Sequence, residues 1–129
     1  MKKILALLLT SVLILCGCTV KENNNEMNTV TENITVTVLG FGDEKLLEKT
    51  VDVEGEATAL SALMTAAPGK VKQSSGVMPY VTEILGLKER EHGAMSGWTY
   101  KVNGESPMVG ADKYILKSGD YVAWIYFTE

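Results

Sequence analysis

Histidine and cysteine are scarce in this chain, which has one histidine and two cysteines among its 129 residues. The histidine, His92, lies in a charged stretch, so no Ser-His-Asp arrangement can be assigned. The glycines form no phosphate-binding motif after a strand. The carboxylates lie near turns, where surface charge explains them better than acid/base catalysis does. We therefore expect a protein that is not an enzyme and requires no cofactor.

Basic residues are also in the minority. Lysine and arginine together number 12 against 16 aspartates and glutamates, which gives a net charge of −4. Nucleic-acid-binding proteins present a clustered basic surface to the phosphate backbone, and docking on anionic lipid requires the same sign of charge. The composition therefore argues against nucleic acid as a partner and against electrostatic attachment to a membrane.

The N-terminus has the parts of a bacterial signal peptide. Two lysines at positions 2 and 3 precede an almost wholly apolar run over residues 4–15. This run is shorter than the roughly 20 residues that span a bilayer, although a buried apolar helix of a cytosolic protein is an alternative. The segment Leu15-Cys16-Gly17-Cys18 resembles the lipobox of bacterial lipoproteins, which implies cleavage after Gly17 and a diacylglycerol on Cys18. Cys16 is a poorer acylation site because bulky residues precede it.

Processing at this site would leave no cysteine chemistry in the mature chain. Cys16 would leave with the signal peptide over residues 1–17, and acylation would occupy Cys18. Removing two lysines leaves ten basic residues against sixteen acidic ones, a net charge of −6. Residues 18–32 then form a lipidated cysteine and a polar, asparagine-rich tether. We expect an exported protein anchored by lipid to the outer face of the cell membrane, with one domain over residues 33–129.

The first part of this domain predicts a β-hairpin. Residues 34–39 alternate with the period of two that is typical of a half-buried strand, and they are rich in β-branched side chains. Residues 40–43 signal a turn. Residues 47–53 can form the returning strand.

A helix is expected next, over residues 59–67. Thr58 is a suitable N-cap, and Pro68-Gly69 ends the helix. Apolar residues at i, i+3, i+4 and i+7 form one face that should pack on a sheet: Leu60, Leu63, Met64 and Ala67.

The remaining residues predict several strands. These cover residues 77–87, residues 98–102 with a turn at Asn103-Gly104, a short segment at 114–116, and residues 121–127. The last strand is apolar on both faces, which favours a central position in the sheet. The order of elements indicates an α+β fold, specifically a β-grasp-like mixed sheet with one packed helix.

Aromatic residues gather in the C-terminal half. Both tryptophans, all five tyrosines and one of the two phenylalanines lie from Tyr80 onward. Such side chains either build the core of a small sheet or stack on a flat ligand. Trp98 is the strongest candidate for a binding role because it follows the glycine-containing run 93–97.

Several motifs of this half together resemble the transcobalamin C-terminal-like domain. They are Ser96-Gly97-Trp98-Thr99-Tyr100-Lys101-Val102-Asn103-Gly104-Glu105, residues 109–114, residues 116–120 and Val122-x-Trp124-x-Tyr126, with residues 80–86 upstream. The resemblance covers about residues 33–127 and implies kinship with the β-domain of intrinsic factor and transcobalamin, which closes over one side of a corrinoid. It implies ligand contacts at the following positions: Tyr80, Ser96, Gly97, Trp98, Tyr100 and Met108.

The chain differs from the animal carriers in lacking their large α-helical barrel, so the domain would offer half of a corrinoid site. The expected function is a surface lipoprotein that binds a corrinoid and presents it to an uptake system, with a transporter or second binding subunit as partner. One alternative is an adhesin-like module for protein or glycan interaction through the same aromatic face. Another is a metal-binding protein using Glu89, Glu91 and His92, although their spacing matches no defined ligand pattern.

Overall fold

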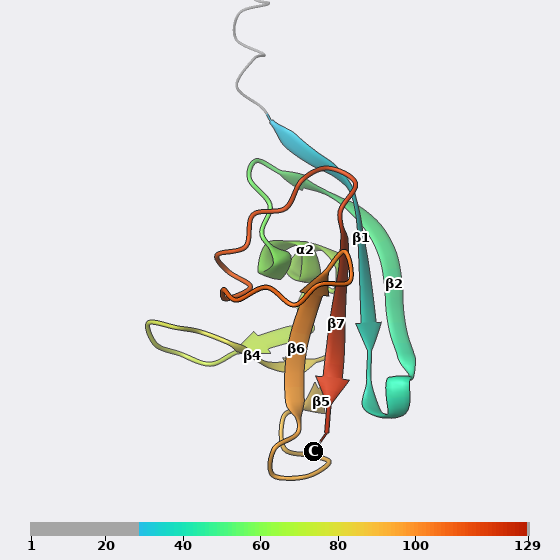
Figure 1. Ribbon diagram of the computed structural model, residues 1–129, viewed down its shortest axis with the longest axis vertical. Coiled ribbons are helices and arrows are strands. Elements are labelled where there is room, and N and C mark those ends of the chain that lie inside the picture. The colour runs from blue at the N-terminus through green and yellow to red at the C-terminus, as the bar shows by residue number, and fades with distance from the viewer. Residues whose placement is uncertain (1–28, 129) are drawn as a thin grey trace, which may run out of the picture.

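The computed structural model describes residues 29–128 (Figure 1). The predicted signal peptide, the predicted lipidation site at Cys18 and most of the predicted tether lie outside the described residues. No helix within residues 29–128 has the length and apolar character needed to cross a membrane.

The main sheet has four strands in the order β2-β1-β7-β6. Their bounds are β1 Val30–Leu39, β2 Lys45–Glu54, β6 Gly97–Val102 and β7 Tyr121–Phe127. β1 and β7 run parallel, whereas β1 with β2 and β6 with β7 run antiparallel. The predicted first hairpin and the interior position of the last strand are both confirmed.

The hairpin is longer than its alternating pattern indicated. β1 begins at Val30, which pairs with Glu54 of β2, although an ordered domain was expected only from Asn33. Asn33 has φ 56, and the register of the pair shifts between Thr31 and Ile34. The exposed residues before this irregularity carry no hydrophobic period, so the sequence pattern could not mark them as strand. A short 3-10 helix η2, Phe41–Asp43, closes the hairpin.

The single α-helix in residues 29–128 is α2, Ala59–Ala66, and it lies against one face of the main sheet (Figure 1). The predicted Thr58 cap is confirmed: its Oγ1 accepts from the Ser61 backbone N–H at 3.0 Å, and Ser61 Oγ accepts from the Thr58 N–H at 2.8 Å. The predicted packing face is confirmed at Leu63 and Ala67, which are buried, and Leu60 is half-buried, whereas Met64 is 39% exposed. The helix buries mainly small side chains, which allow a close approach to the sheet: Ala59, Ala62, Leu63 and Ala66.

A second sheet of three short strands extends to the side of the main sheet (Figure 1). Its strands are β3 Val71–Gln73, β4 Val81–Ile84 and β5 Leu87–Lys88. The predicted strand over 77–87 was therefore too long. It stops where Leu85 and Gly86 turn the chain with φ of 50 and 86, and Thr82 is an extra residue opposite the Lys72–Gln73 step.

This β-bulge explains a second error in the predicted strand. Strict alternation along residues 77–87 would place Val81 and Ile84 on opposite sides of one strand, yet both are buried. An extra residue in one strand breaks the period of two and brings both side chains to the core. The predicted strand at 114–116 is likewise reduced to one bridge between Thr58 and Ile115. The α+β class itself is confirmed.

The core lies between the main sheet, α2 and the small sheet. Because side chains alternate along a strand, β1 and β7 present Val36, Val38, Val122 and Trp124 to this core. The opposite face of β7 carries Ala123 and Ile125, which are half-buried. The sheet is therefore packed mainly on one side, and its C-terminal strands supply the large aromatic residues of that side.

Candidate functional site

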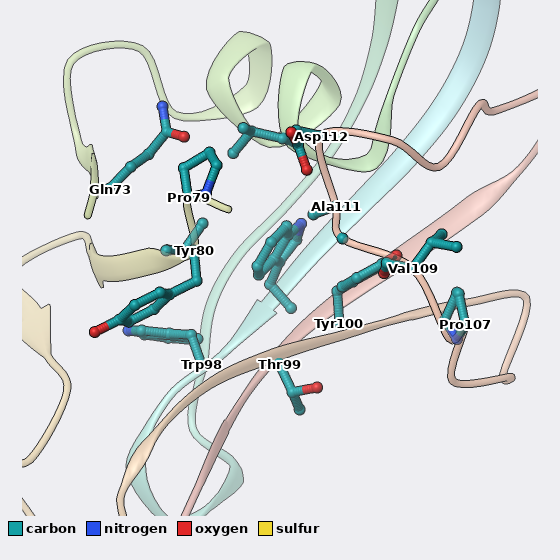
Figure 2. Close-up of a pocket in the computed structure, with 14 residues that line it drawn as sticks. Gln73, Pro79, Tyr80, Trp98, Thr99, Tyr100, Pro107, Val109, Ala111 and Asp112 are labelled. Carbon is teal, nitrogen blue, oxygen red and sulfur yellow. Dashed lines mark hydrogen bonds between the residues drawn. The ribbon is translucent and has the colours of Figure 1, made fainter. Parts of the chain in front are cut away.

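A pocket of about 260 Å³ opens on the helix-covered side of the sheet, between β6 and two loops (Figure 2). We call it the aromatic pocket because four aromatic side chains line it: Tyr80, Trp98, Tyr100 and Trp124. One charged side chain, Asp112, is among the residues that line it. The pocket thus combines flat apolar walls with one acidic group.

Strand pairing brings the aromatic residues of β6 and β7 together. Tyr100 lies directly opposite Trp124 in the sheet, and Trp98 lies opposite Tyr126. The rings of Tyr100 and Trp124 stack at a centroid distance of 5.4 Å and an angle of 29°. Trp98 meets Tyr126 edge-to-face at 5.1 Å. The alternation of side chains along two neighbouring strands therefore builds one continuous aromatic surface.

The walls of the pocket come from the loops at 74–80 and 105–113. In Figure 2, Tyr80 and Trp98 lie at one end of the pocket, and Val109 and Pro107 lie at the other end. The Tyr80 N–H donates to Ser74 Oγ at 3.0 Å, which closes the first loop. Two hydrogen bonds fix the second loop to the rest of the domain. The Tyr100 hydroxyl of β6 donates to the Val109 carbonyl at 2.6 Å. The Leu60 N–H of α2 donates to the Ala111 carbonyl at 3.0 Å.

Burial raises the pKa of the Tyr100 phenol above its ordinary value of 10.0, and the nearby Tyr114 and Asp112 side chains raise it further. The aspartate acts in this way because a second negative charge beside a carboxylate is unfavourable. Tyr100 thus remains a neutral donor. The effect of Asp112 on this pKa means that its negative charge acts on the inner wall of the aromatic pocket.

The two tryptophans differ in how their indole N–H groups are paired. Trp98 Nε1 donates to the Leu87 carbonyl at 2.9 Å. Trp124 is only 2% exposed, and its Nε1 is the one buried side-chain nitrogen or oxygen without a hydrogen-bond partner in residues 29–128. A buried donor without an acceptor costs about 1–3 kcal/mol. The aromatic pocket therefore contains an unused hydrogen-bond donor in its lining.

A second hollow of about 280 Å³ lies on the other side of Tyr80 and Trp98, which line both spaces. Ser96 and Gly97 line this second hollow. The Ser96 hydroxyl is fully engaged, since it donates to the Gly93 carbonyl at 2.8 Å and lies 2.9 Å from the Tyr126 hydroxyl. The hydroxyl thus fixes the loop that precedes β6.

The residues predicted to bind ligand fall into three groups. Tyr80, Trp98 and Tyr100 converge on the aromatic pocket. Ser96 and Gly97 lie in the adjoining hollow. Met108 is 98% exposed at the tip of the second loop, between two residues that line the pocket.

Sequence reasoning did not single out Trp124, Asp112 or Val109 as site residues. Trp124 was assigned to a strand with two apolar faces, and nothing in its local pattern separates a core tryptophan from one that also lines a cavity. Asp112 and Val109 did lie within the quoted 109–114 motif. The one hint in the sequence was that Asp112 is a charged residue within this motif, in a segment that has no strand or helix periodicity.

The residues of the metal-binding alternative, Glu89, Glu91 and His92, are not arranged as a site. His92 stacks on Phe41 at a centroid distance of 3.7 Å, and Glu89 accepts from the Tyr80 hydroxyl at 3.4 Å. Across residues 29–128, no three histidine, cysteine, aspartate or glutamate side chains are grouped so that they could hold a metal ion.

Comparison with known proteins adds a family and a fold. The family model described as "Domain of unknown function (DUF4430)" matches residues 56–128. The chain is 21% identical to a proposed metal-binding protein from Ruminococcus gnavus ATCC 29149, with a TM-score of 0.56 over 76% of this chain and 98% of that one. It is 20% identical to haptocorrin in complex with Cbi, with a TM-score of 0.52 over 78% of this chain and 27% of that one. No curated protein matches the chain. These structures show a shared, transcobalamin-like fold.

Proposed function

This chain belongs to the DUF4430 family, a group of domains of unknown function, and we propose that it is a ligand-binding protein that holds a corrinoid at the aromatic pocket. The topology supports a β-grasp relationship, since a parallel central pair is flanked by two antiparallel strands and one helix packs on the sheet. In this proposal the chain binds its ligand without transforming it.

The observation that carries the proposal is the convergence of four aromatic side chains on one pocket. Trp98, Tyr100 and Trp124 come from adjacent positions of β6 and β7, whereas Tyr80 comes from a separate loop and is 52% exposed. A corrin is broad, partly apolar and edged by amides, so it suits an aromatic surface with a few polar groups. The Cbi complex of haptocorrin, which shares this fold, is consistent with such a ligand.

The size of the pocket limits how much of a corrinoid it can enclose. Pockets that bury a whole drug-sized ligand measure about 300–1,000 Å³, whereas the aromatic pocket measures about 260 Å³. We therefore place one edge of the corrin in the pocket and the rest over the exposed loop residues Val77, Met78 and Met108. The second side of the ligand would be covered by a partner, since the chain spans 27% of haptocorrin.

We place this site outside the cell, on a lipid anchor at Cys18, where it would present its ligand to an uptake system. The support is the lipobox-like sequence before Cys18 and the polar segment that follows. Membrane fractionation of cells carrying Cys18→Ser tests the anchor. The variant should move to the soluble fraction, and continued membrane association would contradict the lipid attachment.

Calorimetric titration of residues 19–129 with cobinamide and with cobalamin tests the binding function. Tyr80→Ala should weaken binding about tenfold, because it removes a half-exposed aromatic wall of the pocket. Phe41→Ala is a matched control: Phe41 is 50% exposed, close to the 52% of Tyr80, and lines neither of the two hollows next to β6. Binding of neither corrinoid at millimolar concentration would reject the proposal, as would equal losses in the two variants.

A further inference from the structure

We infer that the aromatic pocket selects a primary carboxamide, whose carbonyl oxygen accepts from Trp124 Nε1 and whose amide N–H donates to the Asp112 carboxylate. This inference rests on the proposed function and names the part of the ligand that enters the pocket. It starts from two groups in the lining: the Trp124 Nε1 donor, which is buried without a hydrogen-bond partner within residues 29–128, and the Asp112 carboxylate, the one charged side chain there.

The charge of the lining argues for a neutral group. Asp112 is the one charged side chain among the residues that line the pocket, and no lysine or arginine accompanies it. A carboxylate on the ligand would be repelled by Asp112, although it could accept from the indole. An ammonium group would pair with Asp112 but would leave the indole N–H without an acceptor. A carboxamide supplies an acceptor and a donor on adjacent atoms and carries no charge.

The aromatic walls favour the same group. A planar amide can lie against the aromatic walls of the pocket while its edge reaches polar partners, and the Trp124 N–H points outward in the plane of its ring. The Trp98 N–H and the Tyr100 hydroxyl are already committed to the Leu87 and Val109 carbonyls. The donor left for a ligand in these rings is therefore Trp124 Nε1.

The 105–113 loop is a possible way in for the ligand. Trp124 Nε1 is buried, so a segment next to it must move to admit the amide, and this loop supplies five residues of the pocket lining. This loop is exposed at Met108 and Val109 and contains no helix or strand, and such segments open at low free-energy cost. Asp112 itself lies over Gly110, where an added Cβ would come within 2.7 Å of its Oδ1. Gly110→Ala should therefore displace the carboxylate without removing it.

Three small probes of one shape test the inference: benzamide, methyl benzoate and benzoate. In a ¹H–¹⁵N spectrum of the protein, benzamide should shift the Trp124 indole N–H signal downfield, as expected for a donor that gains an acceptor. The Trp98 indole signal is an internal reference and should move less than that of Trp124, because its hydrogen bond to the Leu87 carbonyl is already made. Trp98→Phe assigns the two signals.

The affinities provide the second readout. Benzamide should bind about tenfold more tightly than methyl benzoate or benzoate, as expected for one hydrogen bond to a charged group. Asp112→Ala and Gly110→Ala should each remove this preference, whereas Glu105→Ala, an exposed acid on the same loop outside the pocket lining, should retain it. Equal affinity for the three probes, or a shift of the Trp98 signal alone, would overturn the inference.

Two corrinoids separate this inference from the proposed function: cobinamide, and a corrinoid whose side-chain amides are replaced by methyl esters. Tighter binding of cobinamide supports both. Equal binding of the two keeps the corrinoid function and rejects the carboxamide contact. Binding of neither, together with a benzamide preference, keeps the carboxamide contact and rejects the corrinoid.

Discussion

The two halves of the main sheet are packed with different kinds of residue. The β1–β2 half meets α2 through valine, isoleucine and alanine, and Ile34, Val36 and Leu63 there have no exposed surface. The β6–β7 half presents rings, and it contains both the aromatic pocket and the unpaired Trp124 N–H. Small branched side chains fill space closely, whereas large flat ones leave gaps that loops only partly cover. The first half is therefore closely packed, and the aromatic pocket lies in the second half.

Leu63→Ala, in the β1–β2 half, should have the largest effect on the free energy of unfolding. The side chain is completely buried between α2 and the sheet, so its truncation should lower the free energy of unfolding by about 2–5 kcal/mol. Urea denaturation followed by circular dichroism measures this change. Met64→Ala on the same helix is the control, because Met64 is 39% exposed and its truncation should cost far less. Equal costs for the two variants would contradict the packing described for α2.

Tyr126→Phe should have an intermediate effect on the free energy of unfolding, and the local loosening should be confined to the β6–β7 half. The Tyr126 hydroxyl donates to the Lys88 carbonyl at 2.8 Å and lies 2.9 Å from Ser96 Oγ. Its loss should cost about 1–2 kcal/mol of unfolding free energy, because buried polar partners are left unpaired. Hydrogen exchange should quicken in residues 88–96 and remain unchanged in α2. Equally faster hydrogen exchange in both halves would show that they open together and would contradict the comparison.

The ionisation of Tyr100 should have the smallest effect on the free energy of unfolding. It tests the buried environment of the β6–β7 half through its dependence on pH. Its pKa is raised in the folded state, so this residue's contribution to stability is fully present below about pH 10, the ordinary value in the unfolded chain. That contribution is lost as the pH rises through the folded pKa. Phenolate absorbance of wild type against Tyr100→Phe measures the shift, and Asp112→Ala should lower the Tyr100 pKa slightly. A Tyr100 pKa at or below 10 would contradict the buried environment.

The sequence predicted those parts of the fold that depend only on the pattern of neighbouring residues in the chain. The hairpin followed from alternation, the helix start from Thr58, and the central position of β7 from its two apolar faces. Prediction failed where contacts with residues distant in the sequence change the local pattern. The bulge at Thr82 disrupted the alternation of β4, and Met64 of α2 is exposed while Ala59, Ala62 and Ala66 join Leu63 in the packing face.

The same distinction applies to the candidate site. Tyr80, Trp98 and Tyr100 could be predicted as site residues because motif and aromatic clustering point to them. Trp124 could not, since its role depends on the absence of an acceptor around one nitrogen, which is a property of the folded surroundings. Asp112 depends similarly on the course of a loop without periodicity.

The parallel pairing of β1 with β7 also has a consequence for folding kinetics. These two strands lie far apart in the sequence, at residues 30–39 and 121–127, so the centre of the sheet cannot form until residues 121–127 have been synthesised. Contacts so distant in sequence slow folding, because a long loop must close before they are made.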